Sequence, residues 1–256
     1  MRSWKKSISR ALGEPDLGSR PISVPAESSP QVFTDVSVDP FVRGLLHTPA
    51  NPNGAGMVLT HGAGSNCQAP LLIALAGTFA AAGFVVLRCD LPYRQDRPYG
   101  PPAPGDAKRD RAGLKNALAA IKRHATGRLF LGGHSYGGRQ TSMLCADLAS
   151  EKAPEGPPEI PAGLLLLSYP LHPPRKPEQL RTQHFFHLHT PALFVQGTRD
   201  PFGSTAEIEQ ALKLIPAKTK LLTVEGAGHD LGFKGKAKRE ELPANVLAEF
   251  QAFFGA

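Results

Sequence analysis

The clearest potential for chemistry in this sequence lies in a serine flanked by glycines, Gly133-His134-Ser135-Tyr136-Gly137. The G-x-S-x-G pattern alone is weak, because about 0.1 to 0.2 such matches arise by chance in a chain of this size, so its context must decide. The apolar run 128–133 predicts a strand before the serine, and the segment 136–150 predicts a helix after it. A strand-turn-helix corner exposes a serine in the crevice where open α/β sheets bind ligands. We therefore predict Ser135 as a nucleophile, against the alternative of a glycine-rich turn without chemistry.

A serine hydroxyl needs a base to remove its proton, and a histidine oriented by a carboxylate commonly supplies one. Asp200 and His229 each follow an apolar run that predicts a strand, at 192–197 and 220–226. They are therefore expected at the same edge of the sheet as Ser135, in the chain order Ser, Asp, His. We predict His229 as the general base and Asp200 as the acid that orients it. The alternatives are a turn aspartate and a solvated loop histidine.

Acyl transfer also requires donors for the oxyanion that develops on the substrate carbonyl. The segment HGAGSN, residues 61–66, directly follows the apolar run 56–60. The amides of Ala63 and Tyr136 are the predicted donors, with the amide of Gly62 as an alternative to Ala63. A simple turn between a strand and a helix is the other interpretation of this segment.

Elements that would position these residues follow from an alternation of apolar strands and amphipathic or Ala/Leu-rich helices after Pro30. Two strands separated by a turn at Asp39-Pro40 are expected to form an antiparallel opening pair. Buried strands that alternate with helices predict a mostly parallel central sheet, with helices on both faces. The expected strands are 31–38, 41–49, 56–60, 84–90, 128–133, 163–169, 192–197 and 220–226, and the expected helices are 70–83, 106–124, 136–150, 205–214 and 242–254.

The domain organisation predicted is an extension over residues 1–30, Ser/Pro-rich and basic, followed by one α/β domain over residues 31–256. The extension is expected to be mobile, with a targeting segment as the alternative. No insertion is large enough for a cap domain, so any lid must come from 91–105 or 171–190.

The composition of the chain argues against several classes of binding partner. The 256 residues carry a formal charge of +7, but no basic run interleaved with aromatics supports nucleic-acid binding, and no apolar stretch predicts a membrane span. The cysteines, three in number and without a C-x-x-C pair, predict no disulfide framework and a reducing, cytoplasmic location. A metal site at the clustered His184, His187 and His189 is disfavoured, and no cofactor is expected.

Two further segments leave predicted strand ends near Ser135 and could shape a pocket. Tyr93 and Arg94 follow one strand, and His172 and Arg175 follow another. We expect these four residues at the substrate, where the arginines and the histidine would bind a carboxylate or phosphate. Exposed loop charge is the alternative.

The motifs HGAGSN, LRCDLPYR, GGHSYGG, SYPLHPP, RTQH and LFVQGTRDPFG together resemble the α/β-hydrolase superfamily over about residues 31–256. Within it they look like the KANL3/Tex30-like branch, which is close to dienelactone-hydrolase-like proteins. The resemblance implies an α/β-hydrolase fold without a large cap and the triad of Ser135, Asp200 and His229. A serine, where dienelactone hydrolases carry cysteine, separates this chain from them. The glycine-rich motif is also similar to that of prolyl-oligopeptidase-type peptidases, whose large accessory domain has no room here.

These observations predict a serine hydrolase that cleaves carboxylic ester or thioester bonds of a small molecule through an acyl-enzyme on Ser135. Some animal members of the branch are discussed as subunits of chromatin complexes. The alternative is therefore a non-catalytic hydrolase-fold module that binds a partner or ligand.

Overall fold

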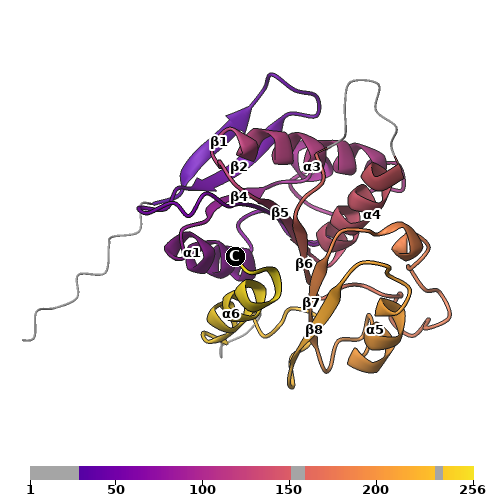
Figure 1. Ribbon diagram of the computed structural model, residues 1–256. Helices are drawn as coiled ribbons and strands as arrows, with labels where there is room; N and C mark the ends of the chain where they lie inside the picture. The colour runs from indigo at the N-terminus through magenta and orange to yellow at the C-terminus, as the bar shows by residue number, and fades with distance from the viewer. Residues whose placement is uncertain (1–28, 151–158, 234–238) are drawn as a thin grey trace, which may run out of the picture.

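Short apolar runs of the sequence become the centre of one sheet. The computed structural model describes residues 29–150, 159–233 and 239–256, and the sheet takes its strands from the first two of these ranges (Figure 1). In the runs GMVLT, VVLRC and GLLLL every residue is buried. Strands read as continuous apolar runs when helices cover both faces of a sheet. The eight strands are β1 (Gln31–Asp35), β2 (Val42–His47), β3 (Gly56–Thr60), β4 (Val85–Cys89), β5 (Leu129–His134), β6 (Gly163–Leu167), β7 (Ala192–Gly197) and β8 (Thr219–Val224).

The strands are ordered β1-β2-β4-β3-β5-β6-β7-β8 (Figure 1). The predicted antiparallel opening pair is confirmed, with Phe33 of β1 opposite Gly44 of β2. β2 also runs antiparallel to β4, and all remaining neighbours are parallel. Parallel strands end at the same edge, so the loops that follow β3, β5 and β7 meet there.

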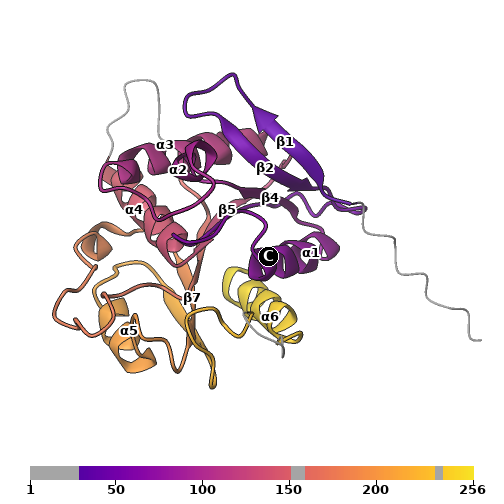
Figure 2. The same cartoon turned by 180° about the vertical axis from the view of Figure 1, so that it is seen from behind.

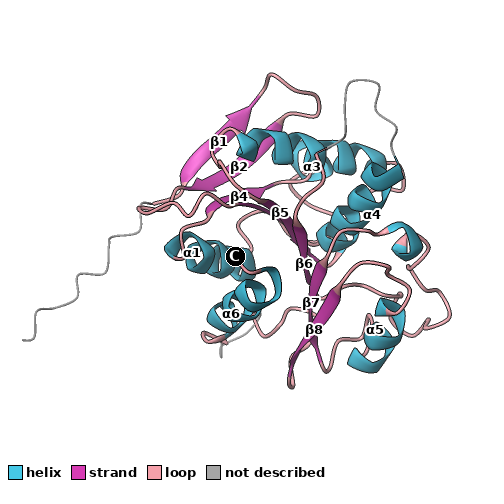
Figure 3. Ribbon diagram, viewed as in Figure 1, coloured by secondary structure: helices cyan, strands magenta, loops and turns pink. Residues whose placement is uncertain are grey.

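Helices cover both faces of the sheet, as predicted (Figures 1 and 2). One face carries α1 (Pro70–Ala81) and α6 (Leu242–Phe254), which pack against each other. The other carries α3 (Asp106–Lys122), α4 (Tyr136–Ser150) and α5 (Thr205–Leu212). Figure 3 shows this layering by element type.

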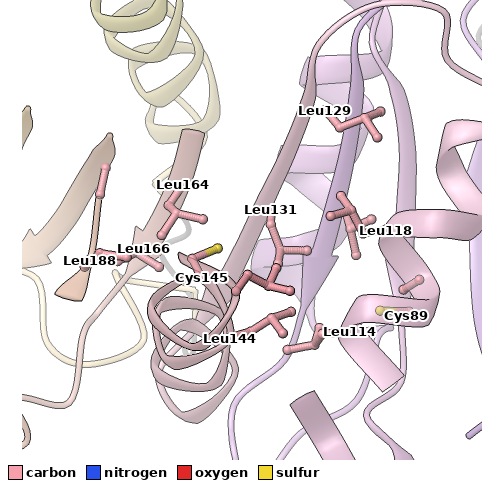
Figure 4. Close-up of a cluster of buried hydrophobic side chains, with 14 of the residues drawn as sticks. Cys89, Leu114, Leu118, Leu129, Leu131, Leu144, Cys145, Leu164, Leu166 and Leu188 are labelled. Carbon is pink, nitrogen blue, oxygen red and sulfur yellow. The ribbon is translucent and has the colours of Figure 1, made fainter. Parts of the chain in front are cut away.

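Two apolar clusters fill the space between the sheet and its helix layers. In the cluster on the α3 and α4 side, Leu114 and Leu144 from these helices meet Leu131 of β5 (Figure 4). On the opposite side, Phe250 of α6 packs edge-on against Phe79 of α1, with ring centroids 5.0 Å apart. These two layers bury β5, the strand that precedes Ser135, from both sides.

Two short elements lie in segments that the sequence analysis treated as irregular. α2 (Pro92–Asp96) starts at a proline, and a single 3₁₀ turn, η1, covers Phe185–His187. Elements of five and three residues are too short to show a helical period. In the described residues, the loops that follow the strands contain no inserted domain. None of the described helices combines the length and the apolar character needed to span a membrane. The extension predicted for residues 1–30 falls almost wholly outside the described residues.

Candidate active site

Ser135 occupies a sharp corner between β5 and α4. Its φ of 52° lies in the left-handed region that non-glycine residues rarely adopt, and its amide donates to the carbonyl oxygen of Leu167, 2.8 Å away. The neighbouring glycines permit this corner. A Cβ on Gly133 would lie 2.6 Å from the carbonyl carbon of Gly137, and a Cβ on Gly137 would lie 2.5 Å from the carbonyl oxygen of His61. The glycines of the motif are therefore required by close backbone packing.

The structure brings the three residues of the predicted triad together. The Oγ of Ser135 is 2.7 Å from Nε2 of His229, and Nδ1 of His229 lies 2.8 Å and 3.0 Å from the two carboxylate oxygens of Asp200. The Asp200 carboxylate is fully buried and also accepts the amide of Phe202 at 2.9 Å. Because an ionised carboxylate only accepts, Nδ1 carries the proton and Nε2 is free to accept the serine proton.

Phe202 packs against the imidazole of His229, and His134 contacts the backbone of the same residue. The ring of Phe202 lies 4.2 Å from that imidazole at an interplanar angle of 31°. On the nucleophile side, Nε2 of His134 is 2.7 Å from the carbonyl oxygen of His229. His134 therefore links the loop that carries His229 to β5, the strand before Ser135. The sequence analysis assigned no role to His134, although it directly precedes Ser135 in the G-x-S-x-G pattern.

Candidate oxyanion donors line the same pocket as Ser135. Tyr136 is the first residue of α4, so its amide has no acceptor within the helix. Ala63 lies in the loop after β3, next to Gly62, and both also border the pocket. The structure thus places the two predicted amides on segments that border the same pocket as Ser135.

Side chains of α2 donate hydrogen bonds to the loop that carries Ala63. The hydroxyl of Tyr93 donates to the carbonyl oxygen of Ala63 at 2.9 Å. Arg94 donates from Nε to the carbonyl oxygen of Ser65 at 2.7 Å and from Nη2 to that of Ala63 at 3.0 Å. Its remaining donors reach the carbonyl oxygens of Arg97 and Gly100. Tyr93 and Arg94 therefore fix the backbone of this loop.

Buried polar groups extend this support. His61 is fully buried, with Nδ1 2.9 Å from the carbonyl oxygen of Gly62 and Nε2 accepting the amide of Leu91 at 3.1 Å. Burial lowers the pKa of His61 to about 4, so it is neutral near pH 7.

The carboxylate of Asp110 links the two segments that carry the candidate oxyanion donors. It accepts the amide of Tyr93 at 3.1 Å and the hydroxyl of Tyr136 at 2.7 Å. It has no exposed surface, and burial raises its pKa. This buried residue of α3 therefore braces α2 against the start of α4.

The four residues expected at the substrate are placed elsewhere, and this corrects the sequence analysis. Tyr93 and Arg94 are buried against the loop after β3, and neither lines the pocket that contains Ser135. Nδ1 of His172 is 2.8 Å from the carbonyl oxygen of Pro173, and its Nε2 is 3.5 Å from a Glu207 carboxylate oxygen. Arg175 is exposed. The loops after β4 and β6 reach the pocket at other residues, such as Pro104 and Arg181, so position directly after a strand does not ensure access to Ser135.

The pocket beside Ser135 has a volume of about 670 Å³. Its walls are largely apolar, and they include Leu71, Leu72, Phe202, Phe233, Pro102 and Pro104. Three polar side chains that the sequence analysis missed also line it: Arg139, Gln140 and Arg181. Arg139 had a usable signal, because a residue four positions after Ser135 lies on the same side of the helix that follows it, whereas the i+5 position of Gln140 gave none. Among the described residues, no group of three or more His, Cys, Asp or Glu side chains forms a metal site.

Comparison with known proteins identifies a family and similar solved structures. A protein-family model described as the alpha/beta hydrolase domain matches residues 53–254. Among solved structures, dienelactone hydrolase from Anabaena variabilis is similar, with 18% identity, a TM-score of 0.63, and coverage of 89% of this chain and 98% of that one. Est1E from Butyrivibrio proteoclasticus shares 16% identity at a TM-score of 0.64, covering 90% and 100%. An α/β serine hydrolase without a lid from Xanthomonas campestris shares 14% at 0.65, covering 90% and 97%.

At these identities the structural likeness establishes the fold, and it confirms the predicted α/β-hydrolase architecture without a large cap. The family model spans most of the chain, including Ser135, Asp200 and His229. The chain therefore belongs to the α/β-hydrolase family.

Proposed function

We propose that this protein is a serine hydrolase that cleaves carboxylic ester or thioester bonds of a small-molecule substrate. The observation that carries the proposal is the continuous relay from the Ser135 hydroxyl to His229, at 2.7 Å, and on to the buried Asp200 carboxylate, at 2.8 Å. An intact relay beside a pocket of about 670 Å³ has the parts that acyl transfer needs.

In the proposed reaction, Oγ of Ser135 attacks the substrate carbonyl carbon while its proton passes to Nε2 of His229. The amides of Ala63 and Tyr136 donate to the oxyanion that forms, and Asp200 stabilises the imidazolium. Collapse of the tetrahedral intermediate breaks the bond to the alcohol or thiol, which leaves with the proton from His229. Water, deprotonated by the same histidine, then attacks the acyl-enzyme and releases the acid and free Ser135.

The finer assignments are also part of the proposal. The motif resemblance supports the KANL3/Tex30-like branch. The three cysteines, Cys67, Cys89 and Cys145, are buried free thiols, which supports a reducing, cytoplasmic location. We propose a small ester or thioester as the only partner that the reaction needs, with no nucleic acid and no membrane.

A fluorophosphonate probe followed by intact-protein mass spectrometry tests the proposal. Wild-type protein should gain one adduct, which peptide mapping places on Ser135, and should turn over p-nitrophenyl acetate. Ser135→Ala should abolish both. Ser150→Ala is the matched control, because Ser150 ends the same helix and its hydroxyl donates to the carbonyl oxygen of Ala146 rather than facing the pocket. A folded wild-type protein that neither reacts with the probe nor hydrolyses an ester and thioester panel would replace the enzyme with a binding module.

A further inference from the structure

Two arginines line the pocket beside Ser135. Arg139 extends from the second turn of α4, and Arg181 comes from the segment between β6 and β7. In the described part of the chain neither forms an ion pair with a carboxylate. Nε of Arg139 is buried and has no hydrogen-bond partner, and the hydrogen bond from the Arg181 guanidinium goes to the carbonyl oxygen of Pro170 at 3.3 Å.

A third donor lies next to them. Gln140 has no exposed surface and lines the same pocket. Its Oε1 accepts from Arg111 at 3.2 Å, so the amide orientation is fixed by a donor that cannot accept. Nε2 of Gln140 is buried without a hydrogen-bond partner. Buried polar groups without partners are costly, so an unsatisfied donor in a pocket wall indicates a group that binds there.

The surroundings do not neutralise this cluster. His184, near Arg139, has a pKa lowered to about 4 by burial and by the arginine charges, so it is neutral near pH 7. The positive charge of Arg139 also lowers the pKa of Arg181, after the larger effect of burial. Asp230 borders the pocket as well, with one carboxylate oxygen accepting the amide of Gly232 at 3.1 Å. Two positive charges thus face one cavity with one carboxylate on its rim.

We propose that Arg139, Arg181 and Gln140 form an anion subsite, and that the substrate is an ester or thioester bearing a carboxylate or phosphate. A guanidinium can donate two parallel hydrogen bonds to a pair of oxygens of either group, and charge-assisted hydrogen bonds are the strong ones. The subsite deepens the proposed hydrolase function and rests on it. Arg139 lies one helical turn beyond Ser135, which places the anion a few bonds from the scissile carbonyl. The apolar wall holds the rest of the substrate.

Matched ester pairs test the substrate class. Mono-p-nitrophenyl adipate and its methyl ester differ only in a negative charge on the acyl side, and 4-acetoxybenzoate and its methyl ester differ only in a charge on the alcohol side. The measurement is the ratio of kcat/KM for the charged over the neutral member. In wild-type protein at least one pair should favour the charged ester. Arg139→Gln and Arg181→Gln should each lower that ratio about tenfold, the value of one charge-assisted hydrogen bond.

Arg175→Gln is the matched control, because Arg175 belongs to the same β6–β7 segment as Arg181 but is exposed outside the pocket. Its ratio should equal that of wild-type protein. Competitive inhibition by adipate and by inorganic phosphate shows which anion the subsite prefers. A wild-type ratio near one for both pairs, or an equal loss in Arg175→Gln, would overturn the subsite while leaving the hydrolase intact.

A binding measurement separates the subsite from the catalytic proposal. Calorimetric titration of Ser135→Ala with adipate needs no turnover. Binding that is lost when Arg139→Gln is added supports the subsite even if no ester is hydrolysed. Unchanged melting temperatures of the arginine variants show that lost binding does not reflect lost folding. Absence of adipate and phosphate binding in a folded protein would overturn the subsite.

Discussion

Arg94→Lys tests whether Arg94 positions the loop after β3, which carries the proposed oxyanion donor Ala63, or contacts the substrate. The guanidinium makes two hydrogen bonds to the loop after β3, to Ser65 at 2.7 Å and to Ala63 at 3.0 Å. A lysine ammonium is a point donor on a flexible stem and keeps the charge but not this fork. We therefore expect it to retain one of the two bonds.

The size of the effect follows from one lost hydrogen bond between a charged donor and a partly buried acceptor, about 2 kcal/mol. If the stabilisation of the transition state by the Ala63 amide decreases by that free energy, kcat falls about 30-fold. The loss should be equal for neutral and anionic esters, with little change in KM, because the loop acts on the reacting carbonyl rather than on the rest of the substrate.

Steady-state kinetics with p-nitrophenyl acetate and mono-p-nitrophenyl adipate measure the split between kcat and KM. Arg109→Lys is a control, because Arg109 is a half-exposed residue of α3 that pairs with Asp96 outside the pocket. A rise in KM confined to the anionic ester, with kcat unchanged, would refute the positioning role and return Arg94 to the substrate.

Three further predictions concern the corner and its supports. Ser135→Ala and His229→Ala should each abolish ester turnover by a similar factor, and the double variant should be no worse, because the residues act as a unit; additive losses in kcat would contradict this. Gly137→Ala should destabilise the fold by about 3 kcal/mol or more, because its Cβ would lie 2.5 Å from a backbone oxygen, whereas Gly64→Ala has open space around its Cβ and should keep the wild-type melting temperature. Because the pKa of His61 is about 4 when folded and 6.5 is its usual value, the unfolded chain binds the extra proton between these pH values, and stability is lost on acidification through that window. His184, whose pKa is lowered to the same value, adds to the effect, so urea unfolding at pH 7, 6 and 5 should show a decrease to which each residue contributes up to about 1.4 kcal/mol per pH unit; a flat profile would contradict their burial as neutral groups.

Elements were predictable where one residue pattern dominated locally. β3, α4 and α6 begin and end at the predicted residues, because apolar runs bounded by turns or by the serine corner leave few alternatives. α2 was missed because five residues starting at Pro92 carry no period. Its position is set by tertiary contacts, including the hydrogen bond from the Tyr93 amide to the buried Asp110.

The triad could be chosen from the sequence because chain order and position after a strand suffice when parallel strands end at one edge. Ser135, Asp200 and His229 follow β5, β7 and β8, so the parallel sheet brings them to one edge, where short loops place their side chains 2.7 Å and 2.8 Å apart. No such rule governs side chains that leave the same edge on longer loops.

For this reason the pocket was decided by tertiary structure alone. Arg94 and Arg139 are both arginines near a strand end, and the sequence favoured the first as a ligand for substrate. The fold buries Arg94 against backbone carbonyl oxygens, which satisfy its donors, and leaves Nε of Arg139 without a partner in the pocket wall. The sequence by itself determined the strands, the nucleophile corner and the order of the triad, since these depend on local pattern and strand direction. Which charged side chains are satisfied internally and which face the cavity depends on how distant loops pack, and that became visible only in the folded chain.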